Sequence, residues 1–414
     1  MPHSHSDHMA HGKKVKVLVV NKFYYRRGGD CTYTLNLEQL LRDNGHEVAV
    51  FAMQYPENIS SAYSGYFATE VNFGNGVIGK LKALGRTMGL GGIKRQFARL
   101  LSDFNPDVVH LNNIHSYLSP VLAAMAHSRG IKVVWTLHDY KLACPSYSCL
   151  CQGRTCEKCF TGMKTGVVQH RCMKGSLIAS ITAWAEAIRW NRNTLQRNTD
   201  TFICPSQFMA EAMARAGFSR DKLVTLNNFM PGHNATQQTD VAGNGDYCCY
   251  VGRLSPEKGV ETLLKAAGEA GIELRVAGGG PMLDELASRY GGSNRITFLG
   301  MQGRDNVEQL LRGAAVSVVP SEWYENNPLS VIESLCLGTP VVGARIGGIP
   351  ELISPADGRL FESGNTNSLK QALLTATQTS WDRNGIAQRA SLRFNPDTHY
   401  RQLVKIYGEH STLT

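Results

Sequence analysis

The sequence predicts an α/β protein with two Rossmann-like, doubly wound parallel-sheet domains facing a central cleft. Three observations predict this: the length of 414 residues, apolar runs that alternate with helical patterns in both halves, and a polar stretch between the halves. A chain of this length exceeds one ordinary hydrophobic core, so two domains are expected. Continuous apolar runs, as opposed to alternating ones, are typical of strands covered by helices on both faces of a parallel sheet.

The first half contains five predicted strands. A glycine turn, Gly28-Gly29, follows the first of them, and an amphipathic stretch at 32–42 follows the turn. These features indicate a strand, a tight connection and a helix, which is the start of a βαβ unit. The predicted strands are 15–20, 47–52, 107–111, 132–137 and 201–204.

The second half repeats this alternation after a polar stretch. Residues 231–245 bear glycine and lack periodicity, which predicts a linker between domains at 13–230 and 246–394. A helix at 395–412 is expected to pack back on the first domain. Ligands of open parallel sheets bind beyond the carboxyl ends of the strands, so the site is expected where those ends face each other. The predicted strands are 247–252, 273–278, 295–300, 315–320 and 340–344.

Composition limits the class of protein. Hydrophobic residues make up 43% and charged residues 19%, as in globular proteins. The formal charge of +9 favours anionic partners, but no nucleic-acid-binding module is recognisable, and we expect no nucleic-acid partner. No apolar stretch approaches the roughly 20 residues of a membrane-spanning helix. Residues 1–12 are His-rich without the apolar core of a signal peptide, so we expect a disordered leader and a cytoplasmic protein.

A diphosphate site is predicted at the connection from the strand 247–252 to a helix that begins at about residue 260. Gly252, Arg253 and Lys258 lie in this connection. A helix start offers free N–H groups and a positive dipole, and two added cations make a site for a diphosphate. Taken alone, an arginine and a lysine on a polar loop are equally compatible with an ordinary surface.

Two glutamates follow the strand 315–320. Glu325 and Glu333 are eight residues apart, which would separate them by about 12 Å in a continuous helix. That distance exceeds the roughly 5–9.5 Å of a glycosidase carboxylate pair. The spacing therefore favours contacts with different hydroxyls of an elongated ligand. Gly347-Gly348, ahead of a helix start at Pro350, predicts a close approach of the backbone.

The segments GRLSPEKG, PSEWYENNPLSVIESLCLGTPVV and GGIPELI, in this order and spacing, resemble the retaining glycosyltransferases of family 4, which have the GT-B fold. The resemblance covers nearly the whole chain and is strongest at 251–352. It implies transfer of a hexose-type sugar from a nucleotide diphosphate sugar to a glycan or lipid-linked acceptor, with retention, in cell-surface polysaccharide assembly. The alternatives are a non-catalytic nucleotide-sugar-binding scaffold and a sugar epimerase or phosphorylase of the same architecture.

The resemblance also implies roles for single residues in the second half. Arg253 and Lys258 would bind the donor diphosphate and stabilise it as leaving group, and Glu325 would contact hydroxyls of the transferred sugar. Glu333 would bind the ribose. The remaining donor contacts would be backbone groups of Gly252, Asn326, Asn327 and Leu329, whereas Pro328 has no N–H to donate.

In the first half, the resemblance implies that Gly28 and Gly29 approach the phosphates and that His138 positions the sugar. No convincing Asp-x-Asp metal motif is present. Lysine and arginine would therefore replace a divalent cation, and catalysis would require no cofactor besides the nucleotide sugar. The nucleotide base, the sugar and the acceptor are left open.

A cysteine-rich insertion is predicted at 141–175, where six of the eleven cysteines lie. Two thiolate pairs can hold a structural zinc ion tetrahedrally, and Cys156-x-x-Cys159 is such a pair. Cys144 and Cys172 are our choice for the second pair. Reduced structural thiols are the other interpretation.

A basic segment at 79–100 carries six lysines and arginines and no acid, with apolar residues between them. One interpretation is a helix lying on the anionic inner face of a membrane, which would bring the protein to a lipid-linked acceptor. The other is a solvated helix face above the acceptor site. The stretch 183–197, with two tryptophans and several arginines, supports the membrane interpretation.

Overall fold

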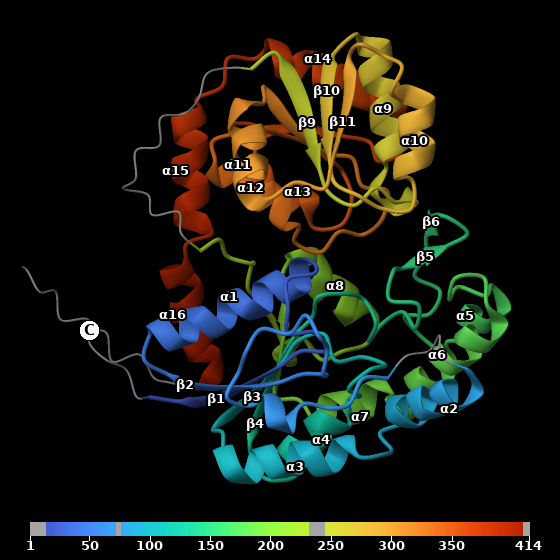
Figure 1. Cartoon of the computed structure of the whole chain (residues 1–414), viewed down its shortest axis with the longest axis vertical. Coiled ribbons are helices and arrows are strands. Elements are labelled where there is room, and N and C mark those ends of the chain that lie inside the picture. Colours follow the sequence, from blue (N-terminus) through green and yellow to red (C-terminus); the bar gives the residue numbers. More distant parts are fainter. Residues whose placement is uncertain (1–13, 72–75, 232–244, 409–414) are drawn as a thin grey trace, which may run out of the picture. The chain divides into compact units, whose positions relative to one another are not determined.

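The computed structural model describes residues 14–71, 76–231 and 245–408. The predicted leader, residues 1–12, and most of the predicted linker therefore lie outside the described residues. The chain divides into two compact units. The first comprises Met1–Thr136, Asn193–Ile203 and His399–Thr414, and the second comprises Leu137–Arg192 and Cys204–Thr398. Each unit is described by itself (Figure 1).

The first six-stranded sheet has the order β2-β1-β3-β4-β7-β8. β1 pairs in parallel with β2 and β3, and β4 pairs in parallel with β3 and β7. Its central strands are almost fully buried, as the apolar runs predict. The strands are β1 (Lys16–Val20), β2 (Glu47–Phe51), β3 (Val108–Leu111), β4 (Lys132–Thr136), β7 (Thr201–Cys204) and β8 (Leu223–Thr225). The helices that connect or flank these strands are α1 (Gly29–Asp43), α2 (Gly76–Thr87), α3 (Ile93–Phe104), α4 (Val121–His127), α7 (Arg192–Arg197), α8 (Gln207–Arg215) and α16 (Pro396–Tyr407).

The second six-stranded sheet has the order β11-β10-β9-β12-β13-β14 and is parallel throughout. Side chains of β9 alternate between its faces: Cys248 and Tyr250 pack in the cluster that contains α9, and Cys249 packs with α11. The strands are β9 (Tyr247–Val251), β10 (Glu273–Ala277), β11 (Ile296–Gly300), β12 (Val316–Val319), β13 (Val341–Ala344) and β14 (Gly358–Phe361). The helices are α9 (Val260–Ala270), α10 (Leu283–Tyr290), α11 (Arg304–Gly313), α12 (Leu329–Cys336), α13 (Ile349–Leu352), α14 (Thr366–Gln378) and α15 (Arg383–Arg393).

The predicted fold class is confirmed, and all ten predicted strands occur within one residue of their predicted ends. The sequence did not predict β8 and β14. Both lie at sheet edges, where β8 is only half-buried and β14 begins with glycine, so neither shows the apolar run of a central strand.

The basic segment 79–100 is not one helix, which corrects the prediction. Gly89 and Gly91 have positive φ angles and separate α2 from α3. Ile93 and Phe97 of α3 are fully buried in the core of the first unit. These two side chains are therefore not available to a membrane surface, whereas Leu90, between the two helices, is 59% exposed. Membrane contact through this segment stays a prediction.

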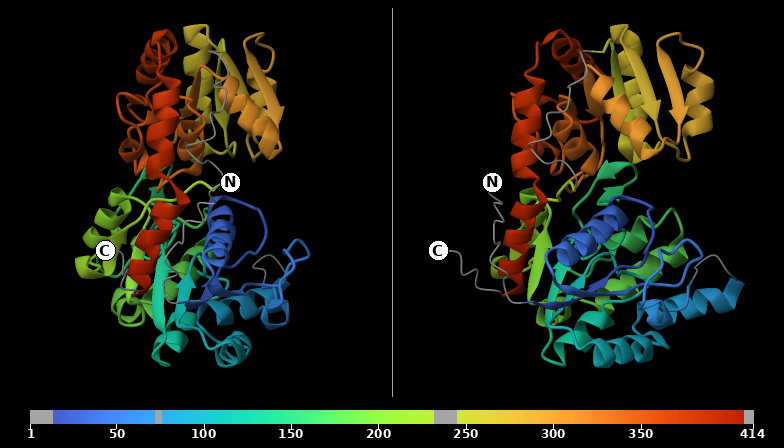
Figure 2. Two further views of the ribbon diagram at one scale, coloured as in Figure 1. Left: turned by 90° about the vertical axis from the view of Figure 1, so that its left-hand side faces the viewer. Right: turned by 60° about the vertical axis from the view of Figure 1, so that its left-hand side comes forward.

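Helix α16 packs within the first unit, far along the chain from the strands it contacts (Figure 2). The Tyr407 hydroxyl lies 2.6 Å from Nδ1 of buried His110 on β3. His399 pairs with Tyr33 of α1 at 3.3 Å. Residues 409–412 of the helix predicted at 395–412 lie outside the described residues.

The cysteine-rich insertion contains a short hairpin, β5 (Leu150–Cys151) and β6 (Arg154–Thr155), and helix α5 (Gly166–Gln169). α6 (Leu177–Arg189) follows it. None of the helices described in the structure combines the length and the apolar character needed to cross a bilayer.

Candidate functional site

The first part of the site is the connection from β9 to α9 in the second unit. It passes through Gly252 and Arg253 into a 3-10 turn, Pro256–Lys258, and Gly259 then starts α9 with a φ of 65°. A Cβ on Gly259 would lie 2.0 Å from the carbonyl oxygen of Pro320 at the end of β12. Glycine is therefore required here by both φ and space, and it brings the turn against the neighbouring strand end.

Lys258 and Glu325 form the central pair of the site. The Lys258 ammonium donates a 2.6 Å hydrogen bond to Oε1 of Glu325 and lies 5.0 Å from the Trp323 ring centroid. The Ser321 hydroxyl donates to the same carboxylate oxygen at 2.7 Å. Burial alone would raise the pKa of Glu325, but the charge of Lys258 and these hydrogen bonds outweigh it and lower that pKa. The site therefore holds a carboxylate and an ammonium at fixed positions.

Arg253 differs from Lys258 in its exposure. Its side chain is 64% exposed and is held only at its edge, by Glu257 at 3.2 Å and Ser255 at 3.3 Å. Ser255 in turn donates to Glu257 at 2.7 Å. The guanidinium is thus oriented while most of its surface stays open, which suits recognition of an anionic ligand.

Gly347 and Gly348 pack directly on the backbone that carries Glu325. A Cβ on Gly347, whose φ is +58°, would lie 2.3 Å from the backbone carbonyl oxygen of Glu325. A Cβ on Gly348 would lie 1.8 Å from the backbone carbonyl oxygen of Asn326. The Gly348 amide donates to the Glu325 carbonyl at 2.7 Å. The predicted close approach of the backbone is therefore present, and it fixes the loop before α12.

Asn326 and Asn327 anchor this loop through their side chains. Asn326 donates to the carbonyl of Leu137 at 2.7 Å and accepts from the Ser206 hydroxyl at 3.0 Å. The Asn327 side-chain oxygen accepts from the Asn228 amide at 2.8 Å. Both side-chain oxygens thus bind protein groups, whereas the side-chain nitrogen of Asn327 is buried without a hydrogen-bond partner in the described residues. The donor contacts that the resemblance implies would be made by backbone groups of this loop.

Glu333 and Leu329 lie on α12. This helix begins at Leu329, so the stretch from Glu325 to Pro328 is not helical and the 12 Å estimate for a continuous helix does not apply. Leu329 occupies the first helical position, where amides have no intrahelical acceptor. Glu333 is one turn further on, and burial raises its pKa, with Glu308 adding to the rise and Arg304 opposing it.

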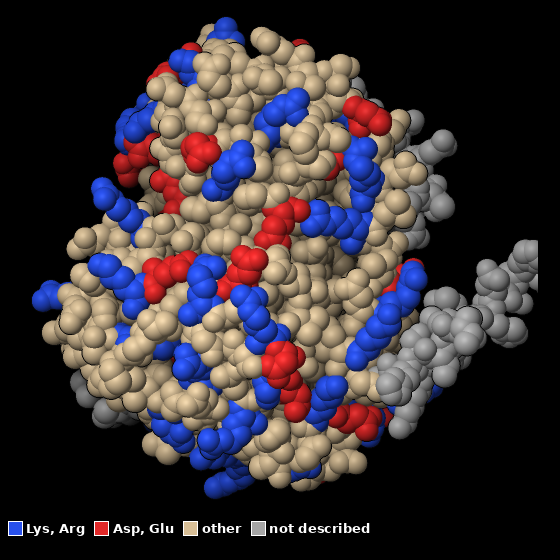
Figure 3. Space-filling model, turned by 180° about the vertical axis from the view of Figure 1, so that it is seen from behind, with Lys and Arg blue, Asp and Glu red and all other residues tan. Residues whose placement is uncertain are grey.

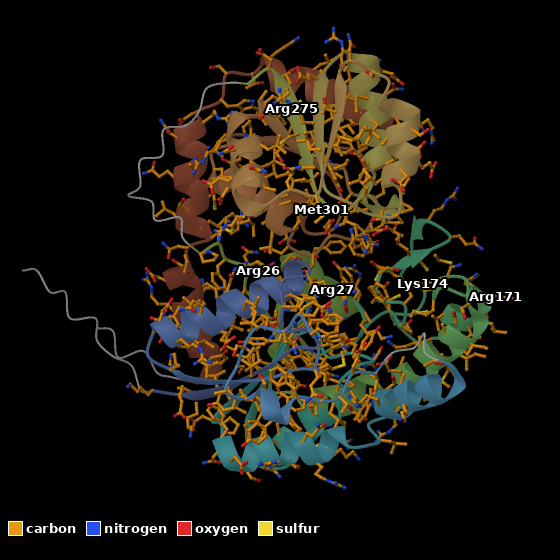
Figure 4. The ribbon with its side chains drawn as sticks, viewed as in Figure 1. Arg26, Arg27, Arg171, Lys174, Arg275 and Met301 are labelled. Carbon is orange, nitrogen blue, oxygen red and sulfur yellow. The ribbon has the colours of Figure 1, made fainter. Side chains whose placement is uncertain are left out.

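Gly28 and Gly29 lie at the start of α1 in the first unit. Gly28 is extended, and a Cβ there would meet only Asp30 at an ordinary 3.5 Å. Neither strain nor crowding within the first unit therefore demands glycine at Gly28, and no side chain caps this helix N-terminus. Arg26 and Arg27, exposed immediately before it, were not predicted as site residues (Figure 4).

His138 is half-buried and belongs to the second unit, together with Glu325. It directly follows Leu137, whose carbonyl receives the hydrogen bond from Asn326. The structure thus brings His138 next to the anchored loop, although the two are far apart in sequence.

Three further features of the site were missed by sequence reasoning. The Trp323 ring lies beside Lys258, and Ser321 bonds Glu325. The glycines 278–280 after β10 approach the β9–α9 connection so closely that a Cβ on Gly278 would lie 1.8 Å from the Gly252 oxygen. The three consecutive glycines after a strand were the available signal for this approach.

Five of the six cysteines of the insertion line a small cavity of about 10 Å³ in the second unit. All eleven cysteines lie in described residues and are free thiols. Cys144, Cys156, Cys159 and Cys172, our predicted zinc ligands, all lie on its wall, together with Cys151 and His170. In the described ranges, however, no group of three or more such side chains is placed to hold a metal ion. The zinc site therefore stays a prediction.

Two family models match the chain. Residues 27–231 match the model described as Glycosyltransferase Family 4, and residues 234–393 match the model described as Glycosyl transferases group 1. Together they cover both halves of the chain, and the second contains the whole constellation around Lys258 and Glu325.

Curated relatives and solved structures agree with these matches. A D-inositol 3-phosphate glycosyltransferase of Mycobacteroides abscessus is 36% identical over 142 residues, and the aligned stretch spans only 32% of each chain. An uncharacterised 42.6 kDa protein in the cps region of Klebsiella pneumoniae is 23% identical over 82% of this chain and 87% of its own.

Among solved structures, HepE of Anabaena in complex with UDP and glucose has a TM-score of 0.65 at 18% identity, over 95% of this chain and 99% of that one. Sucrose-phosphate synthase of Thermosynechococcus elongatus has a TM-score of 0.69 at 18% identity, over 95% of this chain and 98% of that one. At such identities these likenesses concern the fold.

Proposed function

The chain belongs to the group 1 glycosyltransferases with the GT-B fold, and from this premise we propose that it moves a hexose-type sugar from a nucleotide diphosphate sugar to a glycan or lipid-linked acceptor. The observation that carries the proposal is the ion pair between half-buried Lys258 and buried Glu325, beside the exposed guanidinium of Arg253 in the connection from β9 to α9. We assign the reaction to cell-surface polysaccharide assembly, on the inner face of the membrane.

The charges of the site fit the charges that develop in such a reaction. Cleavage between the anomeric carbon and the phosphate leaves negative charge on the diphosphate and positive charge on the sugar ring. Lys258 and Arg253 would stabilise the first, and the carboxylate of Glu325 would hold sugar hydroxyls near the second. Because Glu325 fixes the ammonium before any ligand binds, little reorganisation is needed during the reaction.

The remaining assignments follow the family resemblance. Glu333 would bind the ribose, His138 would position the sugar, and the amides at Leu329, Gly28 and Gly29 would approach the donor. Retention and independence of divalent metals belong to the same proposal, with Lys258 and Arg253 in the place of a cation. The UDP and glucose bound to HepE support a nucleotide diphosphate sugar as co-substrate.

The proposal is tested by thermal-shift screening of UDP, GDP, ADP and TDP and their sugars, with and without EDTA. A shift with one nucleotide family that is unaffected by EDTA is expected. Arg253→Ala should lower turnover of the identified donor about 100-fold, by analogy with removal of one preorganised stabiliser. Lys265→Ala/Arg289→Ala, which removes two paired cations elsewhere in the same unit, should leave turnover unchanged. The absence of a shift with every nucleotide would contradict the proposal.

A further inference from the structure

Exposed apolar side chains gather on and beside α6. Of the ten large apolar side chains that are exposed in the described residues, five lie between 163 and 188. Ile178 is the most exposed of them, at 76%. We call this set and the cations around it the α6 face; its apolar members are Met163, Leu177, Ile178, Ile181 and Ile188.

The buried side of α6 explains why these apolar side chains are exposed on its other side. Ser180, Ala183 and Glu186 follow each other at helical spacing and are buried. Glu186 pairs with Lys141 at 2.9 Å, and both side chains are less than 8% exposed. Since one side of the helix is held inward in this way, Ile178, Ile181 and Ile188 necessarily occupy the opposite side.

The exposed charges in the segment that carries the α6 face, residues 158–192, are of one sign, and the preceding Glu157 is paired with Arg215. Between residues 158 and 192 the only acid is Glu186, which is buried and paired. Four cations in this stretch are exposed. Figure 4 shows two of them, Arg171 and Lys174, on the segment between α5 and α6. The exposed cations are Lys158, Arg171, Lys174 and Arg189.

We propose that the α6 face docks on an anionic phospholipid surface, with its isoleucines among the acyl chains and its cations at the headgroups. An apolar row flanked by lysine and arginine is the composition of helices that lie in the plane of a membrane interface. The helix has 13 residues, about 20 Å, which suffices for such contact. This docking does not depend on the proposed transfer reaction.

The charges argue against a second copy of this chain as occupant. A two-fold dimer through the α6 face would bring the same surface from each copy together. The four exposed cations of one copy would then face four cations of the other, with no exposed acid between 158 and 192 to separate them. An anionic lipid surface, by contrast, supplies the missing negative charge.

The test is flotation of the full chain with vesicles of phosphatidylcholine alone and with 30% phosphatidylglycerol. The wild-type protein should bind the anionic vesicles at least tenfold more tightly, and Ile178→Asp/Ile181→Asp should lose at least tenfold of that affinity. Met301→Asp/Leu392→Asp changes two side chains of similar exposure elsewhere (Met301 is labelled in Figure 4) and should bind like the wild type. Thermal melting confirms that each variant is folded.

A second pair of variants distinguishes the effect of cations on the α6 face from the effect of the overall net charge on vesicle binding. Arg171→Gln/Lys174→Gln should weaken binding about 10- to 30-fold. Lys94→Gln/Arg95→Gln, which removes two exposed cations from α3, should leave it unchanged. Equal losses in both pairs would overturn the proposal, as would failure of the folded wild type to bind anionic vesicles. A dimer in analytical ultracentrifugation that Ile178→Asp/Ile181→Asp dissociates would assign the face to a second copy and also overturn it.

Discussion

Glu325 is the residue on which the candidate site depends. Its carboxylate receives hydrogen bonds from Lys258 and Ser321, and its carbonyl accepts from Gly348. It therefore fixes one cation of the predicted diphosphate site and one close backbone approach at the same time. Substitutions of Glu325 that remove its charge or change the shape of its side chain are therefore expected to disturb the site.

We predict that this carboxylate stabilises the fold in a pH-dependent way. Because the pKa of Glu325 is lowered in the folded protein, its ionised form contributes stability above the unfolded pKa of about 4.3, and the contribution is lost as the pH falls through the lower folded pKa. Wild type should exceed Glu325→Gln in free energy of unfolding at pH 7, and the difference should shrink below pH ~4. Urea unfolding at several pH values measures it; a difference independent of pH would contradict the prediction.

At this scale the sequence predicted the charged residues and missed what holds them. Lys258, Glu325 and Arg253 are recognisable because the segments that carry them occur in the order and spacing of a known family, whereas each charge taken alone is compatible with an ordinary surface. The anchoring role of Asn326 was not predictable, because its partners Leu137 and Ser206 are distant in sequence and reach it only through the fold.

Among the elements, the turn before α13 is tightly limited by space. We predict that Gly348→Ala lowers the free energy of unfolding by about 1–3 kcal/mol. The alanine Cβ would lie 1.8 Å from the backbone carbonyl oxygen of Asn326, so the loop before α12 would have to move. Gly268→Ala is the matched control. It lies in α9 with open space around it and should be neutral or stabilising by about 0.5–1 kcal/mol. Thermal unfolding and donor binding report both effects; equal stability of the two variants would contradict this account.

The cysteine insertion gives a prediction about metal removal. Protein purified without nickel should contain about one zinc per chain, held by the four predicted thiolates around the cavity, which has room for a single atom or water molecule. Burial raises the pKa of Cys159 to about 11 and that of Cys172 to about 12, so binding must displace protons and should strengthen as the pH rises.

Metal analysis with the variant Cys156→Ser/Cys159→Ser checks this, and Cys31→Ala, a buried cysteine of the first unit, serves as control. A zinc content below about 0.2 equivalents in the wild type would leave reduced structural thiols as the interpretation.

Elements with continuous apolar runs were predicted well, and elements defined by interruptions were not. Every buried strand was found because its pattern depends on local sequence alone. The break between α2 and α3 was missed although Gly89, Gly91 and Gly92 mark it, because the basic periodicity on both sides was read as continuous. The exposed apolar row lies on α6, outside the segment 79–100 for which membrane contact was predicted.

For the whole molecule, the first relevant property is its net charge. The formal net charge is +9, and on the face shown in Figure 3 basic side chains are more numerous than acidic ones. This excess favours encounter with anionic ligands of any kind. Specific contacts must therefore come from local arrangements such as the Lys258–Glu325 pair.

We predict that the contact between α16 and β3 contributes measurably to the stability of the first unit. Tyr407→Phe removes the hydroxyl that pairs with buried His110 and should cost about 1–3 kcal/mol. Tyr66→Phe, in the same unit, removes a hydroxyl whose bond to Asp103 is exposed, and should cost less than about 0.5 kcal/mol. Hydrogen exchange in β1 and β3 should rise only in Tyr407→Phe. Equal exchange in the two variants would show that the contact is dispensable.

The chain order of α16 has a consequence for synthesis. The strands at the centre of the first sheet leave the ribosome early, but the helix that pairs with His110 and Tyr33 is made only after the entire second sheet. Domains generally fold in the order of translation. Here the first unit would emerge from the ribosome without the α16 contact and could not complete its packing until the second unit had been synthesised. During that interval the nascent chain would be accessible to chaperones and prone to aggregation.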